Sequence, residues 1–231
     1  MPAAQAAPAG SAAAAVSAPP ARRPRGPRWE RRKDSRPSEL LDAALDLFVE
    51  RGYAAARLDD VAARAGVSKG TLYLYYANKE ELFKAVVRAS IVPLLQEFRA
   101  EIEHDDRSAE VLLAGYVDAW WTRFGSTRLA GIIKLIIGEA GNFPEVARFF
   151  DSEVVSGNHE LVTLILRRGV ERGEFRDIDV DLVAHSVMAP LVMKSIWANS
   201  IEPCCTVARV EPARFVRHHL DLLLRSLRRA P

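Results

Sequence analysis

The sequence has few residues that could cross-link it. Only two of its 231 residues are cysteines, and they are neighbours, Cys204 and Cys205, so they cannot build a disulfide framework. Chains this poor in cysteine are typical of the reducing cytoplasm, where we expect this protein to function. Adjacent cysteines form only strained disulfides. Idle thiols are therefore the favoured interpretation of the pair, and a redox or thiophilic-metal sensor is the alternative.

The sequence also lacks a segment that predicts export or membrane insertion. No uninterrupted apolar run approaches the roughly 20 residues needed to cross a bilayer. The alanine-rich N-terminus has no preceding basic residue and no strong apolar centre, so we expect no signal peptide. A chain of this length can form one large domain or two small ones with a sizeable core.

Motifs for catalysis and for metal binding are missing too. The sequence has no nucleophile elbow, no phosphate-binding loop and no zinc-ligand set. Of the histidines, only His218 has a spacing, and a weak one, at which it and Asp221 could bind the same metal ion. Structural or surface roles are therefore expected for His159, His185, His218 and His219. We predict no catalytic residue, no metal, no cofactor and no enzyme activity. An enzyme built on a helical bundle is the remote alternative.

The small net charge of +2 hides an uneven distribution. Residues 1–34 hold seven of the 32 Lys and Arg residues but only two of the 30 Asp and Glu residues. These residues are rich in alanine, proline and arginine, with too little apolar bulk to fold alone, and are predicted to be disordered. The favoured interpretation is a passive, solvated tail. The alternative is a basic arm that adds phosphate contacts to a DNA-binding unit.

Apolar spacing predicts helices along the rest of the chain. Residues recur at helical spacing from Ser35, while strand-type alternation and repeats are absent. Gly52 should end the first helix, and Pro93 should kink the fourth or mark a join. The later helices are expected at about 58–65, 68–76, 79–103, 108–125, 128–140, 144–173, 179–200 and 211–229. The predicted fold is all-α, with a three-helix head at 35–94 and a bundle at 95–231.

The stretch 61–76 predicts a short helix, a glycine turn and a second short helix, which is a helix-turn-helix. Gly66 permits the sharp turn, Ser68 caps the second helix, and Leu72 should face the core. No acid occurs from residue 67 to residue 78. The second helix can therefore approach the DNA backbone without charge repulsion.

The exposed side of this second helix is predicted to contact DNA. Thin side chains at its start let the backbone approach base edges in the major groove, and Tyr73 lies on the same face one turn after Gly70. Tyrosines and a lysine further along are placed to hold flanking phosphates. The predicted contact residues are Lys69, Gly70, Thr71, Tyr73, Tyr75, Tyr76 and Lys79.

Residues from about Ser35 to Ala89 resemble the N-terminal domain of the tetracycline-repressor (TetR) family of bacterial transcription regulators. The resemblance covers about a quarter of the chain. It is carried by LDAALDLF (41–48), RGY (51–53), DVA (60–62), AGVSKGTLY (65–73), YY (75–76) and NKEELF (78–83). It implies a homodimer with recognition helices in successive major grooves of double-stranded DNA. It also implies a C-terminal ligand pocket that controls DNA binding.

The chain departs from the family pattern where the helix-turn-helix, at about 57–76, begins. The family usually has Ser or Thr at this point, whereas this chain has Arg57 followed by Leu58. The cap is therefore lost, and we expect Arg57 to supply a phosphate contact instead. Tyr76 replaces the family's usual phenylalanine.

Aromatic residues are frequent in the C-terminal region. Core packing is the favoured interpretation for most of them, while the resemblance favours an apolar pocket for a lipophilic or planar ligand. Because Trp120 and Trp121 are adjacent, we expect one in the core and the other exposed at a pocket or an interface. The predicted pocket residues are Trp120, Trp121, Phe124, Phe143, Phe150 and Trp197. The stretch Gly131 to Gly157 looks like the AcrR-type and AefR-type branch of the family.

The last two helices carry broad apolar faces, and the stretch 222–224 is apolar nearly all round. Such helices need burial on more than one side, which predicts a homodimer through a four-helix bundle. We therefore predict a ligand-responsive, dimeric DNA-binding transcription regulator. It would be a repressor that a small, lipophilic effector releases from a near-palindromic operator. The alternatives are an activator of the same fold and a ligand- or partner-binding helical module without specific DNA recognition.

Overall fold

The computed structural model describes residues 28–202, 204 and 210–229, with side chains from residue 37 on. Within these residues the elements are helices, and the one extended pairing is an isolated bridge between Phe175 and Arg228. The predicted all-α fold is confirmed. Most of the predicted tail, up to residue 27, lies outside the described residues, as does Cys205.

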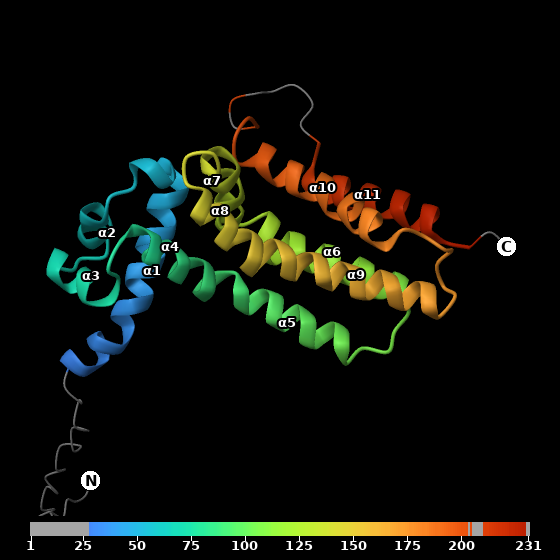
Figure 1. The fold of residues 1–231 in the computed structure, drawn as a ribbon, viewed down its shortest axis with the longest axis horizontal. Coiled ribbons are helices and arrows are strands. Elements are labelled where there is room, and N and C mark those ends of the chain that lie inside the picture. Colours follow the sequence, from blue (N-terminus) through green and yellow to red (C-terminus); the bar gives the residue numbers. More distant parts are fainter. Residues whose placement is uncertain (1–27, 203, 205–209, 230–231) are drawn as a thin grey trace, which may run out of the picture. The chain divides into compact units, whose positions relative to one another are not determined.

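Four helices form the N-terminal part of the fold (Figure 1). They are α1 (Arg28–Ala55), α2 (Leu58–Arg64), α3 (Lys69–Tyr75) and α4 (Lys79–Ser90). Helix α1 begins at Arg28 and not near Ser35, and it continues through Pro37. At Gly52 the backbone turns to φ 81°, where the absence of a Cβ removes the steric cost, so the regular helix stops there as predicted.

The head is held together by an aromatic core and by ion pairs. Phe48 of α1 stacks on Tyr53 at 5.8 Å between ring centroids and meets Phe83 of α4 edge-on at 5.4 Å. Arg64 of α2 forms two hydrogen bonds with the Glu50 carboxylate, at 2.8 and 2.6 Å. These contacts hold α4 and α2 against α1.

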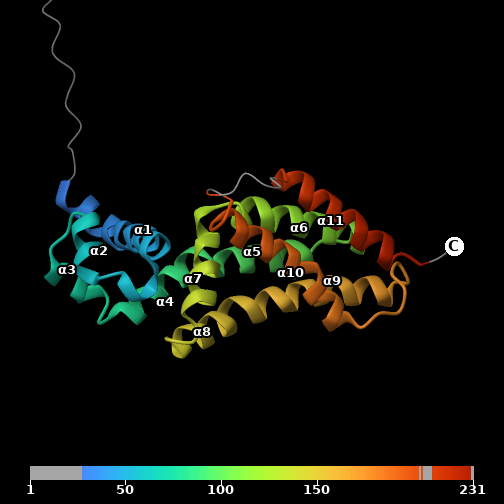
Figure 2. The same cartoon turned by 90° about the horizontal axis from the view of Figure 1, so that it is seen from above.

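The remaining elements form a helical bundle (Figure 2). Its first half contains α5 (Val92–Glu103), α6 (Ala109–Trp120), η1 (Trp121–Gly125), η2 (Arg128–Ala130) and α7 (Gly131–Glu139). Its second half contains α8 (Pro144–Phe150), η3 (Asp151–Val155), α9 (Ser156–Glu171), α10 (Val180–Ala198) and α11 (Pro212–Leu227). Helices α4 and α5 meet at Ile91, with Pro93 in the first turn of α5, so the predicted join is confirmed.

Helix α9 is central to the bundle. It contacts α5, α6 and α10, while α11 packs on α6 and α10. The two ribbon views show α6 and α9 running side by side along the bundle. Leu161, Ile165 and Leu166 of α9 are fully buried, so this helix supplies much of the core.

Two of the bundle elements, η1 and η3, are single π-helical turns. Each continues the helix before it, so the predicted stretches 108–125 and 144–173 are each helical but not regular α-helices. A π turn contains one extra residue per hydrogen-bonded ring, which shifts the helical face that follows. Apolar periodicity did not predict these turns.

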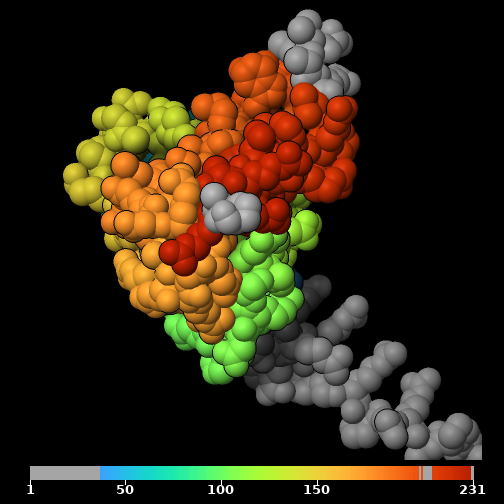
Figure 3. Space-filling view, turned by 90° about the vertical axis from the view of Figure 1, so that its right-hand side faces the viewer, coloured from blue at the N-terminus to red at the C-terminus, as the bar shows by residue number. Residues whose placement is uncertain are grey.

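Helix α10 is unusually apolar and only partly buried. Among the described helices it is the one long and apolar enough, by length and composition, to cross a membrane. Only 28 % of its most apolar stretch is buried. The search for an uninterrupted apolar run missed this helix because Asp181 and Lys194 interrupt its apolar residues. Exposed residues on it include Leu182 at 64 % and Trp197 at 42 %. Figure 3 shows α11, in red, at the surface of the bundle beside the orange helices.

Candidate functional site

The helix-turn-helix is built as predicted. Gly66 adopts φ 66° in the turn, and the N–H of Val67 donates to the carbonyl of Ala62 at 3.0 Å. The Ser68 hydroxyl caps α3 by accepting from the N–H of Thr71 at 3.1 Å. Leu72 is completely buried. One face of α3 is therefore anchored in the head, which leaves the rest of this short helix free to meet a ligand.

The free face of α3 carries most of the predicted DNA contacts. Lys69, Gly70, Tyr73 and Tyr75 are exposed, while Thr71 and Tyr76 are half-buried. The Thr71 hydroxyl shares a 2.8 Å hydrogen bond with the Ser68 hydroxyl. Burial raises the pKa of the Tyr76 phenol, so this group stays protonated and able to donate a hydrogen bond at neutral pH.

Lys69 already has an acidic partner in the head. Its ammonium lies 2.9 Å from a carboxylate oxygen of Asp59 and 5.8 Å from the centre of the Tyr73 ring. The hydrogen bond to Asp59 raises the pKa of Lys69, which keeps the ammonium charged. Both members of the pair are well exposed, and such pairs contribute little to stability. A DNA phosphate could therefore replace Asp59 as the partner of Lys69 at small cost.

Leu74 lies between two predicted contact residues, Tyr73 and Tyr75, and was not itself predicted to contact DNA. Its side chain is 84 % exposed, the most of any large apolar residue among those described. The sequence could have indicated this exposure, because Leu72 already occupies the core-facing position of this short helix. Leu74 also lies on a different face from Tyr73 and Tyr75.

The structure assigns Lys79 a different role from the predicted phosphate contact. Its ammonium donates to the carbonyl oxygens of Tyr53 at 2.7 Å and Ala54 at 3.0 Å. It also lies 4.7 Å from the centre of the Tyr53 ring, and burial lowers its pKa. Lys79 satisfies the carbonyls left free at the end of α1, where a cation is favourable. Its charge is thus used inside the head and is not free for DNA.

Arg57 lies at the N-terminus of α2, where the family pattern led us to expect a lost cap. Its backbone is extended, and it makes no capping hydrogen bond with its side chain. The guanidinium is exposed and lies close enough to Lys69 to act on that residue's pKa. Arg57 therefore shares an exposed, positively charged region with Lys69 at one end of the helix-turn-helix.

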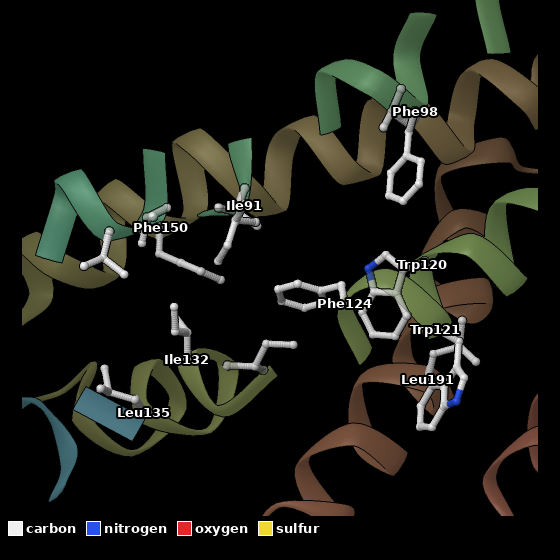
Figure 4. Close-up of a cluster of buried hydrophobic side chains, with 14 of the residues drawn as sticks. Ile91, Phe98, Trp120, Trp121, Phe124, Ile132, Leu135, Phe150 and Leu191 are labelled. Atoms are coloured by element: carbon white, nitrogen blue, oxygen red, sulfur yellow. The ribbon is translucent and has the colours of Figure 1, made fainter. Parts of the chain in front are cut away.

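The bundle contains a partly open cavity of about 260 Å³. It lies between α5, α6, α7, α8, α9 and α10, and residues of both π-helical turns line it. Figure 4 shows the lining residues Ile91, Phe98, Trp120, Phe124 and Phe150. The residues that line it are Ile91, Leu94, Leu95, Phe98, Trp120, Phe124, Ile133, Ile136, Ile137, Phe150, Val154, Val155, Asn158, Met188 and Val192. No charged side chain belongs to this lining. π turns recur at functional sites, and here they turn Phe124 and Val154 toward the cavity.

Three of the six predicted pocket residues line this cavity, namely Trp120, Phe124 and Phe150. Trp121 does not. It is buried like its neighbour, so the expectation that one of the two tryptophans would be exposed is wrong. The π turn that begins at Trp121 lets both rings enter the core, where their centroids lie 6.5 Å apart.

The other two predicted pocket residues lie elsewhere. Phe143 packs edge-on against Tyr53 of the head at 4.7 Å, and Trp197 lies partly exposed on α10. The predicted pocket residues were all aromatic, whereas aliphatic residues of α5, α7, η3 and α10 supply most of the wall. Their helical stripes were visible in the sequence. Which stripe faces a cavity depends on how distant helices meet.

Polar contacts connect the head to the wall of the cavity. Arg88 of α4 pairs with Glu153 of η3 at 2.8 Å, and Arg128 pairs with Asp42 and Asp46 of α1 at 2.6 and 2.5 Å. The neighbours of Glu153 in η3, Val154 and Val155, line the cavity. A change in the cavity wall can therefore reach α4 directly.

The histidines form no metal site among the described residues. The rings of His159 and His185 lie 4.9 Å apart, and Asp181 lies 3.3 Å from His159 Nε2. In the part of the chain that the structure describes, no three His, Cys, Asp or Glu residues are grouped to hold a metal ion. His219 instead bonds to the carbonyl of Val187 at 2.9 Å.

Comparison with known proteins identifies both halves of this architecture. Residues 40–86 match the model for bacterial regulatory proteins of the tetR family, and residues 103–200 match a tetracyclin repressor-like C-terminal domain. The HTH-type transcriptional activator FasR of Mycolicibacterium smegmatis is 32 % identical over 78 % of this chain and 80 % of its own length. This chain belongs to the TetR family.

Two further relatives extend the comparison. The HTH-type transcriptional repressor KstR2 of Rhodococcus jostii is 32 % identical over 65 % of this chain and 73 % of its own length. The crystal structure of the transcriptional regulator FadR from Bacillus subtilis in complex with stearoyl-CoA shares the fold. Its TM-score is 0.68 at 20 % identity, over 82 % of this chain and 98 % of that chain. This TetR-family protein is therefore a DNA-binding transcription regulator and not an enzyme.

Proposed function

We propose that this TetR-family chain is a homodimeric repressor that leaves a near-palindromic operator when a small apolar effector enters the cavity. The observation that carries the proposal is the wall of that cavity. One of its π turns, η3, both lines the cavity with Val154 and Val155 and pairs with Arg88 of α4 through Glu153. Occupancy of the cavity and position of the head are thereby linked.

The DNA surface consists of α3 and the start of α2. Lys69, Gly70, Thr71 and Tyr73 face base edges, and Arg57, Tyr75 and Tyr76 hold flanking phosphates. In a dimer the two recognition helices would lie roughly 34–36 Å apart to enter successive major grooves of B-DNA. A near-palindromic operator would then match the twofold symmetry of the protein.

The effector is an apolar molecule. No charge lines the cavity, so an ion could not be held there without a large desolvation cost. Relatives support this choice, because the Bacillus subtilis FadR structure contains stearoyl-CoA. We propose a lipophilic effector with an apolar chain or ring system in the cavity. Trp120, Phe124 and Phe150 would contact it.

The dimer forms through α10 and α11. Leu182 of α10 and Leu222 of α11 are 64 % and 54 % exposed, and large apolar exposure of this kind favours a partner surface. The same pairing explains why α10 is apolar enough to resemble a membrane span: a second copy would cover it. Two copies of α10 and α11 would make a four-helix bundle. A regulator of this kind acts in the cytoplasm, where its operator DNA is.

The switch is a shift between two conformers. The effector would bind more tightly to a conformer whose heads no longer match the operator spacing, and this difference in affinity drives release. Helix α4 joins the cavity wall to the head and would carry the movement. Whether the outcome is repression or activation depends on where the operator lies, and the relatives include an activator, FasR, and a repressor, KstR2.

The proposal is tested by operator binding. Operators selected from random DNA by the purified protein would be titrated by fluorescence anisotropy with wild type, Lys69→Ala and Tyr73→Ala. Each variant should weaken binding about tenfold, because a good base contact is worth about 1–3 kcal/mol, while circular dichroism and dimer mass stay the same. Unchanged affinity in both variants would reject α3 as the recognition helix.

A further inference from the structure

The cavity is apolar except at one place. Asn158 of α9 is the one lining residue with an amide, hydroxyl or charged group, and Trp120 of α6 adds an indole N–H. All other lining side chains are aliphatic, phenyl or thioether groups. A polar group in such a wall is costly unless it finds a partner, so this corner requires an explanation.

The amide of Asn158 is held in one orientation. The hydroxyl of Tyr116 of α6 donates a hydrogen bond to Asn158 Oδ1. Tyr116 is deeply buried, and burial raises its pKa, so this hydroxyl remains a donor at any physiological pH. With Oδ1 directed to Tyr116, the amide presents its NH₂ group on the other side. Within the described chain no acceptor takes a hydrogen from that NH₂ group.

The indole of Trp120 adds a second donor to the lining. Tyr116 and Trp120 are four residues apart on α6, so they share a helical face one turn apart. Within the described residues the Trp120 N–H also has no acceptor, and the nitrogen is not sealed in the core. Figure 4 shows this nitrogen on the ring edge nearest Phe98 and Phe124, two other lining residues.

We propose that the Asn158 amide, oriented by Tyr116, donates a hydrogen bond to a neutral carbonyl oxygen of an effector whose part inside the cavity is otherwise apolar. This inference rests on the proposed apolar effector and adds the one polar group that the effector must carry. The cavity corner offers only donors, so the matching ligand group is an acceptor. Trp120, on the same face of α6 as Tyr116, is the other donor that lines the cavity.

The lining also decides the charge of that group. A carboxylate would need a cation, and none lines the cavity. A plain hydrocarbon would bury the amide and indole N–H groups without acceptors, which is unfavourable. A thioester, an ester or a ketone on an apolar body fits both demands. Acyl thioesters and steroid ketones share this chemistry, and experiment can separate them.

The test compares two ligands that differ only at the carbonyl. Wild-type full-length protein would be titrated with lauroyl-CoA and with its thioether analogue S-dodecyl-CoA, by calorimetry and by release of operator DNA. Since one hydrogen bond in a dry site changes affinity by about tenfold, lauroyl-CoA should bind about tenfold more tightly. Equal affinity for the two ligands would overturn the proposal without any variant being made.

Variants test which residue causes the preference for lauroyl-CoA over the thioether. Asn158→Leu keeps the side-chain size and removes the donor, so it should bind both ligands with the affinity that wild type has for the thioether. Tyr116→Phe leaves the amide free to rotate and should lower the preference to a few-fold. Asn142→Leu makes the same replacement outside the cavity and should keep the full preference. A preference retained in Asn158→Leu would also overturn the proposal.

Two further ligands distinguish an acyl thioester from a steroid ketone as the source of the carbonyl. They also distinguish failure of the carbonyl contact from failure of the proposed apolar effector. Progesterone represents a steroid ketone: if it binds and lauroyl-CoA does not, and Asn158→Leu weakens it about tenfold, the carbonyl contact stands with a steroid as its source. Lauric acid, a carboxylate at neutral pH, should bind far more weakly than the neutral carbonyl compound. If wild type bound none of these ligands, the apolar effector itself would be rejected. Binding without carbonyl preference rejects only the role of Asn158.

Discussion

At the scale of single residues, Leu74 has an exposure that the fold does not explain. It projects from α3, between Tyr73 and Tyr75, with 84 % of its side chain exposed. An exposed leucine on a helix that enters the major groove can pack against thymine methyl groups. We therefore assign Leu74 to the DNA surface, where the bases would cover its side chain on binding.

Leu74→Ala should weaken specific operator binding about tenfold, because it removes apolar contact worth about 0.8 kcal/mol per buried CH₂ group. Folding stability should not change, since the side chain contacts no core. Anisotropy titrations against the operator and against unrelated DNA would measure this. Non-specific binding and the salt slope should be those of wild type. A decrease of equal size on both DNAs would mean that Leu74 does not contact bases.

Lys79 supports the head through the carbonyls of Tyr53 and Ala54. Lys79→Met keeps the length of the side chain and removes its charge, so those two carbonyls lose a charged donor. Because the ammonium is only partly buried, we expect a loss of about 1–2 kcal/mol in the free energy of unfolding, measured with urea. Operator affinity of the folded protein should fall by less than for Lys69→Ala. The opposite order would restore the phosphate contact that the sequence predicted.

At the scale of elements, α4 and η3 form the connection between cavity and head. The Arg88 guanidinium pairs with Glu153 and lies 5.0 Å from the centre of the Phe149 ring. Exposed ion pairs contribute up to about 1 kcal/mol. The pair matters for coupling, because it joins a turn that lines the cavity to the helix that carries the head.

Arg88→Ala and Glu153→Gln should each reduce the effector's influence on operator affinity by up to about fivefold, the equivalent of about 1 kcal/mol of coupling. The ratio of operator affinities with and without saturating lauroyl-CoA measures this influence. Arg99→Ala is the matched control, since Arg99 and Glu160 form a similar exposed pair between α5 and α9. If the control reduced the coupling as much, the link through α4 would be refuted.

The elements also show how far local sequence signals reach. The glycine stop at Gly52, the turn at Gly66 and the cap at Ser68 were all predicted and are observed. Each depends on contacts within about one helical turn. The π turns were not predicted, because apolar periodicity averages over several turns and one inserted residue barely alters it.

At the scale of the whole molecule, the apolar faces of α10 and α11 predict a dimer, and Leu222→Glu tests it. A charge placed in an apolar subunit interface is strongly unfavourable, so the mass in solution measured by light scattering should fall from dimer to monomer. Operator affinity should fall with it, because two half-sites no longer bind together. Leu74→Glu, a charge on a still more exposed leucine of the head, should leave the dimer mass unchanged. A dimeric Leu222→Glu variant would place the interface elsewhere.

The N-terminal basic segment is also tested on the whole molecule. Deletion of residues 1–27 removes Arg22, Arg23 and Arg25 and leaves α1 its full observed length. If these arginines bind phosphates, the slope of log affinity against log salt should become less steep by about 0.9 for each phosphate that the shortened protein no longer neutralises. Titrations from low to moderate salt would measure the slope. An identical slope would support the passive tail.

The sequence by itself determined the helices, the helix-turn-helix and its exposed face, and the resemblance to the TetR family. These features depend on residues that are near one another in the chain. Only the tertiary structure decided which apolar stripes enclose a cavity, why Trp121 and Phe143 do not line it, and that Lys79 binds the end of α1. The tertiary structure also brought Tyr116 and Asn158 together, because their contact depends on how α6 and α9 pack and not on any local pattern.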